Sequence, residues 1–453
     1  MLSFQVSAKS MTTLRFYSLV GLTVTLYYVL SKILFDKVYE TTQVVIDEYF
    51  HITQGLAYCN GNFSEWNPKI TTLPGLYLVS ALASYVECNT YNLRFVNLIG
   101  SCINLILFAS ILKYIYLSEK NQLKIIIQAV SLTLLPPLYF FSHVYYTETL
   151  SLMFLLLYTR LSLTNRHLVL IFMTGLCAVI MRQTNIIWVA LVLLHKVMDI
   201  FIKSSRVFGN AYINDVKLSI RTLIARDIDK SKLKRHYGIM LLVSFAAFLR
   251  YNGGIVVGDK NAHVVTIHLP QLLYFLLFYG VFGLPYVLLK LVSTLKLMLK
   301  EKTLVLLTGI VFILVVYHNT MVHPYMLADN RHYTFYIWNR WFGKYDFAVY
   351  ATIPVYIFLL FSLYDNLKDH NCITFLLPYT LCLLPVLTLQ RLIEIRYFLC
   401  PYIVIRLRFT KPPYAVVIAE FLWYILINAA TFYVFFTKEV YWKDFDYAQR
   451  IIW

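Results

Sequence analysis

Charged side chains are scarce in this chain, and their scarcity limits the class of protein. Asp, Glu, Lys and Arg make up only 14% of the 453 residues, whereas 59% of the residues are hydrophobic and the mean hydropathy is +0.65. A water-soluble domain carries about 25% charged residues. The composition therefore excludes an ordinary soluble globule and indicates an all-α polytopic membrane protein.

Acidic residues are scarcer than basic ones, since 23 Asp and Glu stand against 40 Lys and Arg. A basic excess is typical of nucleic-acid binding, but here the basic residues are dispersed over short loops, as the positive-inside rule describes. The longest polar segment, 203–236, holds nine Lys and Arg against three Asp. We interpret it as a basic cytosolic loop and expect no nucleic-acid partner.

Cysteine motifs are absent from the sequence. The seven cysteines lie singly, mostly within apolar runs, and none has a CxxC or metal-ligand spacing. We expect them to be small hydrophobic residues rather than a disulfide framework or metal ligands. They are Cys59, Cys88, Cys102, Cys177, Cys372, Cys382 and Cys400.

No small-residue cleavage site follows the first apolar run, which Lys9 and Arg15 precede. We interpret this run as a retained signal anchor with its N-terminus in the cytosol. Segment 36–91 is then the first lumenal loop. Within it, residues 73–86 are apolar but too few to span, which suits an interfacial helix.

The whole chain, 1–453, is expected to form a single domain of about 12–14 transmembrane helices. Crossings are predicted near 125–143, 147–164 and 168–181, among others. The cytosolic loops carry mainly Lys and Arg, whereas the lumenal segments mix carboxylates, His, Arg and Lys. A topological anchor needs only Lys and Arg, and mixed charges at a membrane face are costly unless they pair or bind something. The mixture therefore indicates a functional site on the lumenal side.

The first of these lumenal segments is "VVIDEYFHITQGLAY", residues 44–58. As a helix, it has an apolar stripe of Val45, Tyr49, Ile52 and Leu56, with the side chains of Asp47, His51 and Gln54 on the opposite face. A carboxylate held there, Asp47 or Glu48, can deprotonate a hydroxyl as a general base. The alternative is that the two acids only end the first span.

The segment "GDKNAHVVTIH", 258–268, contains Asp259, Lys260, His263 and His268. Lys260 and protonated histidines suit a phosphate group. Zinc is an alternative ligand, but the spacing of the two histidines is not that of HExxH and no cysteine lies near. Interfacial polarity without catalysis is the other alternative.

Further acids and bases lie in "ADNRHYTFYIWNR" and at predicted span ends. Asp329, Arg331 and His332 lie among aromatic residues, which suits a phosphate beside a sugar or lipid. The groups at span ends are either structural ion pairs or parts of such a site. They are Arg182, Glu394 and Arg396, and the same two alternatives apply to His143 and Glu148. The triplet Asn62-Phe63-Ser64 fits a glycosylation sequon.

Four blocks of this sequence closely resemble one eukaryotic family: "DEYFHITQGLAYCNGNFSEWNPKITTLPGLYLVS", "RQTNIIW", "GDKNAHVVTIHLPQLLYF" and "HPYMLADNRHYTFYIW". It is the family of endoplasmic reticulum α-1,2-glucosyltransferases that use dolichyl phosphate glucose and add the last glucose to the lipid-linked oligosaccharide. The resemblance runs from residue 40 to the last residue, 453, and leaves out segment 203–236.

The resemblance implies a GT-C glycosyltransferase architecture in the endoplasmic reticulum membrane, with a lumenal active site. It implies transfer of a third glucose from dolichyl phosphate glucose to the diglucosylated, dolichyl-diphosphate-linked acceptor, with release of dolichyl phosphate. In such enzymes an acid of the first lumenal loop is the usual base, which falls here on Asp47 first and Glu48 second. We expect a monomer in the membrane lipid.

The implied reaction is a single displacement with inversion, because the donor linkage is β and the product linkage is α. Cations must then stabilise the phosphate that leaves. The candidates are Lys260, His263, His268, Arg331, His332, Arg396 and Arg182. Acceptor contacts or structural polar roles are left to His51, Gln54, Glu148, Asp329 and Glu394. No metal and no other cofactor is expected.

Two other functions compete with this one. Another dolichyl-phosphate-sugar-dependent GT-C transferase would share the fold and the acid. A multi-span transporter or channel would carry charges through span centres and have repeat-like halves. Here the charged clusters lie at one predicted face and no internal repeat is present.

Overall fold

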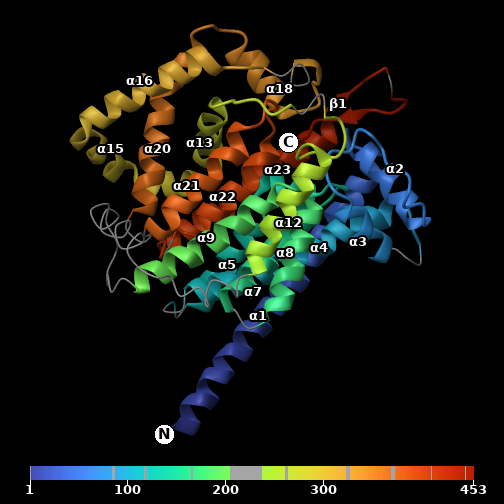
Figure 1. Cartoon of the computed structure of the whole chain (residues 1–453), viewed down its shortest axis with the longest axis horizontal. Helices are drawn as coiled ribbons and strands as arrows, with labels where there is room; N and C mark the ends of the chain where they lie inside the picture. Colours follow the sequence, from blue (N-terminus) through green and yellow to red (C-terminus); the bar gives the residue numbers. More distant parts are fainter. Residues whose placement is uncertain are drawn as a thin grey trace. The chain divides into compact units, whose positions relative to one another are not determined.

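A computed structural model of the chain describes residues 2–83, 87–116, 119, 121–164, 167–204, 237–260, 264–322, 327–368, 373–409, 411–443 and 445–453. The described residues are almost entirely helical, with one two-stranded ribbon (Figure 1). The predicted basic loop 203–236 lies, from residue 205 onward, outside the described residues. The chain folds as two compact units, each of which is discontinuous in sequence.

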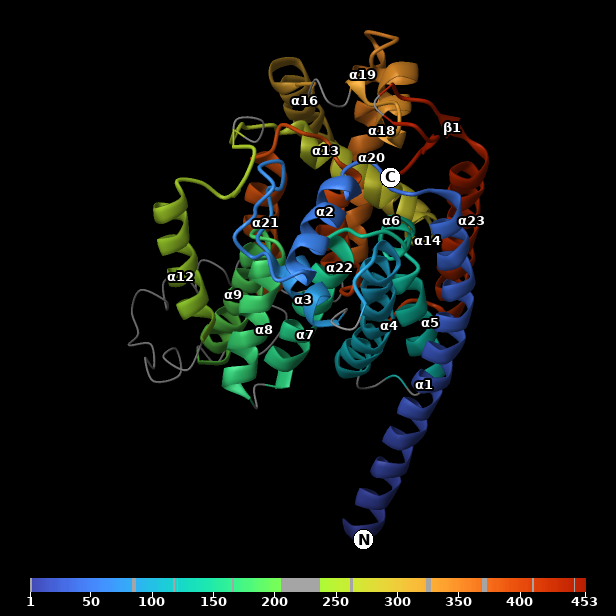
Figure 2. The ribbon, with the colours of Figure 1, turned by 90° about the vertical axis from the view of Figure 1, so that its right-hand side faces the viewer.

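Unit 1 comprises Met1–Glu65, Leu76–Leu156 and Lys411–Arg450. Its elements are α1 (Leu2–Thr41), α2 (Glu48–Cys59), most of α3 (Gly75–Ala83), α4 (Thr90–Ile115), α5 (Gln122–Thr133), α6 (Pro136–Phe141), the first half of α7 (Glu148–Thr164), α23 (Tyr414–Thr437), β1 (Glu439–Val440) and β2 (Gln449–Arg450). Figure 2 shows α4 and α5 side by side with α1 along them. The strands β1 and β2 pair antiparallel, with Glu439 opposite Arg450.

Hydroxyl and amide side chains connect the long helices of unit 1. The hydroxyls of Tyr27 on α1 and Ser101 on α4 lie 2.6 Å apart. Asn428 on α23 donates to the carbonyl of Leu134 at 2.8 Å. In a membrane such bonds stabilise helix association, because lipid offers no alternative partner for a polar group.

Unit 2 comprises Trp66–Gly75, Leu157–Thr410 and Ile451–Trp453. Its elements are α8 (Leu168–Met181), α9 (Asn185–Ser204), α12 (Tyr237–Asn252), α13 (Pro270–Phe282), α14 (Leu284–Leu289), α15 (Leu291–Lys300), α16 (Lys302–Asn319), α18 (Tyr333–Ile337), the π-helix η1 (Trp338–Phe342), α19 (Ala348–Ala351), α20 (Ile353–Leu367), α21 (Ile373–Thr388), the 3-10 helix η2 (Ile395–Phe398) and α22 (Leu399–Arg406). In this unit α8, α9 and α12 pack together, and α15 and α16 pack on α20 (Figure 1).

Five described helices are long and apolar enough to cross a membrane. They are Thr13–Thr41, Thr90–Ile115, Lys302–Asn319, Ala348–Leu367 and Tyr414–Thr437. Six shorter apolar helices of 10–17 residues accompany them. These helices bear out an all-α polytopic membrane protein, while the count of 12–14 spans stays a prediction.

Prolines explain part of the fragmentation. The predicted crossing 125–143 is two helices, α5 and α6, because Pro136 and Pro137 lack the N–H groups that would continue α5. The crossing predicted over 168–181 coincides with α8. Within the predicted interfacial segment 73–86, the described residues form α3, which has nine residues and is too short to span.

Candidate functional site

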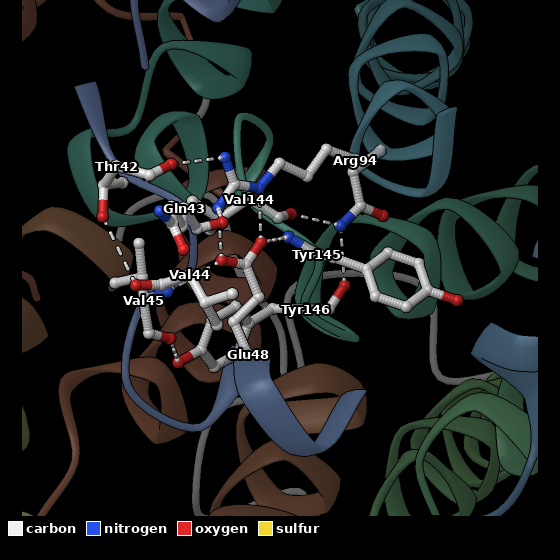
Figure 3. Close-up of polar contacts among 10 residues, drawn as sticks. Thr42, Gln43, Val44, Val45, Glu48, Arg94, Val144, Tyr145 and Tyr146 are labelled. Carbon is white, nitrogen blue, oxygen red and sulfur yellow. Dashed lines mark hydrogen bonds and ion pairs between the residues drawn. The ribbon is translucent and has the colours of Figure 1, made fainter. Parts of the chain in front are cut away.

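Glu48 begins α2 and lies at the centre of a buried hydrogen-bond network in unit 1 (Figure 3). Its Oε1 accepts from Arg94 Nε at 2.8 Å and from the Tyr145 N–H at 2.6 Å. Its Oε2 accepts from Arg94 Nη2 at 2.7 Å and from the Val45 N–H at 3.0 Å. The side chains of Glu48 and Arg94 are both 0% exposed. Both carboxylate oxygens are therefore occupied by hydrogen bonds, and Glu48 ties the start of α2 to Arg94 and to the backbone of Tyr145.

Asp47, the preceding residue, has a different environment. It is the N-cap residue of α2, but its side chain does not cap the helix, and the residue is partly exposed. Its neighbour Ile46 has φ +46°, a left-handed conformation that is strained for a β-branched residue. Backbone strain of this kind is concentrated at functional sites. Of the two adjacent acids, Asp47 is the partly exposed one and Glu48 is the buried one.

The helix face predicted for 44–58 is wrong in part. Tyr49 was assigned to the apolar stripe but is 52% exposed, while Ile52 is buried as predicted. Gln54 was assigned to the Asp47 face but is buried, and its side-chain amide donates to the carbonyl of Glu65 at 2.7 Å. The buried residues of α2 are instead Glu48, Ile52, Gln54, Gly55 and Tyr58, and the helix begins only at Glu48, so Val45 belongs to the preceding turn.

His51 lies one turn after Asp47 and is only partly buried. Its Nδ1 is 2.7 Å from the hydroxyl of Tyr77, and its ring packs edge-on against Tyr146. Both tyrosines are buried, so they set the orientation of the imidazole. His51 is thus a polar group held near the start of α2.

A disulfide joins Cys59, the last residue of α2, to Cys88, one residue before the N-cap of α4. The expectation that the cysteines form no disulfide is therefore wrong for this pair. The other described cysteines form no disulfide, and Cys372 lies outside the described residues. Disulfides persist in oxidising compartments. Beside the bridge, Asn62 of the sequon is exposed, and its side-chain amide donates to Glu65 at 2.6 Å.

Unit 2 carries a separate cluster of arginines and carboxylates. Arg331 forms a fork with Asp329, with Nε to Oδ1 at 2.9 Å and Nη2 to Oδ2 at 2.8 Å. His332 Nε2 is 3.9 Å from the same carboxylate. Burial alone would raise the pKa of Asp329, but the hydrogen bonds from Arg331 and the neighbouring positive charges outweigh it and lower the pKa.

The second acid of this cluster is Glu394, which contacts Arg396. Burial would raise its pKa, but Arg396, His332 and Arg182 together lower the pKa below its usual value. Charges act strongly only over short distances, so the structure brings these three basic residues to one carboxylate. Residues that the sequence offered from three distant segments thus form one cluster.

The other predicted cations are exposed, buried or outside the described residues. Lys260 is exposed and donates to the carbonyl and side chain of Asn252 at the end of α12. His268 is fully buried, and burial lowers its pKa. His143 is buried as well, which lowers its pKa to about 4. His263 lies outside the described residues. His268 and His143 are therefore poor sources of positive charge.

Glu148 is the first residue of α7 and is buried. It belongs to unit 1. Among the described residues, no group of three His, Cys, Asp or Glu could hold a metal ion.

Sequence reasoning missed the residues that hold both sites in place. Arg94 lies near the start of the apolar helix α4, and an ionisable residue within an apolar span is a signal that would have found it. The residues at the C-terminus carry no sequence signal of this kind. Ile452 pairs by backbone hydrogen bonds with Arg331 and Tyr333, at 2.8 and 3.0 Å, and so supports the loop of the arginine cluster.

Comparison with known proteins identifies a family that this chain matches. The sequence model of the DIE2/ALG10 family matches residues 41–407. A Drosophila melanogaster protein is 41% identical over 93% of this chain and 96% of its own length. A Homo sapiens protein is 35% identical, over 90% and 93% respectively. An Arabidopsis thaliana protein is 28% identical, over 90% and 94%. All three are named Dol-P-Glc:Glc(2)Man(9)GlcNAc(2)-PP-Dol alpha-1,2-glucosyltransferase. No solved structure matches the chain.

Proposed function

Because this chain belongs to the DIE2/ALG10 family, we propose that it is a dolichyl-phosphate-glucose-dependent α-1,2-glucosyltransferase. It transfers glucose from dolichyl phosphate glucose onto the diglucosylated, dolichyl-diphosphate-linked oligosaccharide. The observation that carries this proposal is the 41% identity to the Drosophila relative over 93% of the chain, since that relative is named for this donor and this acceptor.

Asp47 acts as the general base in this reaction. The acceptor 2-hydroxyl oxygen attacks the anomeric carbon, the bond from that carbon to the phosphate oxygen breaks, and dolichyl phosphate leaves with the electron pair. The hydroxyl proton passes to Asp47. Support for this role comes from the partial exposure of Asp47, whereas the buried Glu48 already accepts hydrogen bonds at both carboxylate oxygens.

The arginine cluster of unit 2 binds the donor phosphate. Arg182, Arg331 and Arg396 outnumber the two carboxylates among them, Asp329 and Glu394, so the cluster keeps a net positive charge. The carboxylates orient the guanidinium groups by ion pairing, and guanidinium geometry suits bidentate contact with phosphate. His332 adds a further donor. Preorganised cations stabilise the charge that grows on the leaving phosphate, and the proposal includes no metal or other cofactor.

The site faces the lumen of the endoplasmic reticulum, in a multi-pass protein that works as a monomer. The Cys59–Cys88 disulfide supports this orientation of the first loop, because the reducing cytosol disfavours such bonds. The exposed sequon at Asn62 lies in the same loop.

The test is glucose transfer by the purified, lipid-reconstituted protein. Dolichyl phosphate glucose is the donor, and the lipid-linked acceptors carry no, one or two glucoses. Transfer only to the diglucosylated acceptor supports the proposal. Transfer to the unglucosylated acceptor, or transfer of mannose from dolichyl phosphate mannose, would make the protein another GT-C transferase. No transfer of any sugar would remove the proposed function.

Asp47→Asn tests the base in the same assay. We expect kcat to fall by about 100- to 10,000-fold, the usual contribution of a general base. Glu87→Gln is the control, because Glu87 is an exposed carboxylate of the same predicted loop. If Asp47→Asn keeps most of its activity, the base lies elsewhere.

A further inference from the structure

Several backbone groups in the first part of the turn from Thr42 to Glu48, which carries Asp47, form hydrogen bonds with buried side chains (Figure 3). Arg94 reaches two carbonyls, that of Thr42 at 3.4 Å from Nη1 and that of Gln43 at 2.9 Å from Nη2. Glu48 accepts from the Val45 N–H. The hydroxyl of Tyr146 donates to the Val45 carbonyl at 3.1 Å. These bonds fix the backbone directly before Ile46 and Asp47.

The turn needs such support because its shape is unfavourable. Ile46, between Val45 and Asp47, has φ +46°, which a β-branched residue rarely adopts. A strained conformation persists only when its surroundings over-determine it. Here the surroundings are rigid: Arg94, Glu48 and Tyr146 are all buried, and the two charged groups neutralise each other.

We propose that Arg94, Glu48 and Tyr146 form a positioning frame that holds Asp47 in place for proton transfer. The inference rests on the proposed function, in which Asp47 is the base. None of the three residues needs to touch substrate. Arg94 and Glu48 hold the two ends of the turn, and Tyr146 holds its middle, directly before the strained Ile46.

The frame has a kinetic signature. A base works only within hydrogen-bond reach of the proton, and a displacement of about 1 Å can cost about 100-fold in rate. Loosening the frame moves the base without removing any substrate contact. The rate of the chemical step should therefore fall while substrate binding stays the same, so kcat changes and KM does not.

Tyr146→Phe is the decisive variant, because it deletes one hydroxyl and leaves the buried ring in place. Tyr139→Phe is the matched control: Tyr139 is another buried tyrosine of unit 1, and its hydroxyl lies 2.9 Å from Ser31 Oγ, away from the turn. We expect Tyr146→Phe to lower kcat about tenfold or more with KM for both substrates within twofold. Tyr139→Phe should keep wild-type kcat, and both variants should show similar thermal unfolding.

Arg94→Lys is the second variant, which keeps the charge opposite Glu48 but replaces the five-donor fork by one ammonium group. It should show the same loss of kcat at unchanged KM. If Tyr146→Phe and Tyr139→Phe behave alike while Asp47→Asn is inactive, the frame is refuted and the proposed function stands. A rise of KM at unchanged kcat in Tyr146→Phe also refutes it, because that pattern belongs to a binding residue. An active Asp47→Asn removes the base itself, and the frame with it.

Discussion

Breaking the Glu48–Arg94 ion pair should be far more costly than breaking an ion pair at the surface. Both partners are 0% exposed, and two bonds of 2.8 and 2.7 Å join them. Removing one partner of a buried pair leaves an uncompensated charge and costs about 3–5 kcal/mol. Glu48→Gln and Arg94→Met should each lower the free energy of unfolding by this amount. In Glu48→Gln the amide also points an N–H group at a backbone donor of Val45 or Tyr145.

The double variant Glu48→Gln/Arg94→Met separates the contribution of the ion pair to stability from the contribution of side-chain packing. It leaves no buried charge, so its loss should be smaller than the sum of the two single losses by about 1–3 kcal/mol. Lys32→Met is the control, because the Lys32–Asp36 pair is 27% and 40% exposed and its loss should cost less than about 1 kcal/mol.

The measurement is denaturant unfolding in mixed micelles, followed by tryptophan fluorescence. Midpoint and slope are compared among the wild type, the two single variants, the double variant and Lys32→Met. Single variants that lose no more stability than Lys32→Met would refute the buried pair. Strict additivity in the double variant would show that the two side chains stabilise the turn independently.

Three further predictions concern other parts of the chain. Arg182→Gln should raise the donor KM about tenfold by removing one charged donor, whereas Arg250→Gln, at an exposed position of α12, should not. Cys59 and Cys88 should react with maleimide only after reduction of denatured membranes, and labelling without reduction would contradict the disulfide. The lowered pKa of Glu394 contributes stability that is present above the unfolded value of about 4.3 and is lost as pH falls through the folded pKa. Acid unfolding of Glu394→Gln should therefore start from lower stability and depend less on pH below about 4.3.

Much of the fold could be predicted, because a membrane imposes a strong pattern on the sequence. Long apolar runs predicted where helices lie, and α8 has the bounds that its apolar run predicts. The break between α5 and α6 was missed because hydropathy is averaged over a long apolar run and does not register that the rings of Pro136 and Pro137 end a helix. The start of α2 at Glu48 was missed for a related reason, since the turn before it is apolar and looks like helix.

The site was harder to predict, and Asp47 and Glu48 show why. Adjacent residues at a helix start point about 100° apart, so one side chain can face the interior while the other faces solvent. Which of the two is buried depends on partners distant in sequence: Arg94 and Tyr145 lie 46 and 97 residues from Glu48. The disulfide also depends on partners that are distant in sequence, because Cys59 and Cys88 are 29 residues apart and only the folded chain brings them together. Local patterns therefore identified the acidic pair, and only the three-dimensional contacts divided it into one buried anchor and one accessible acid.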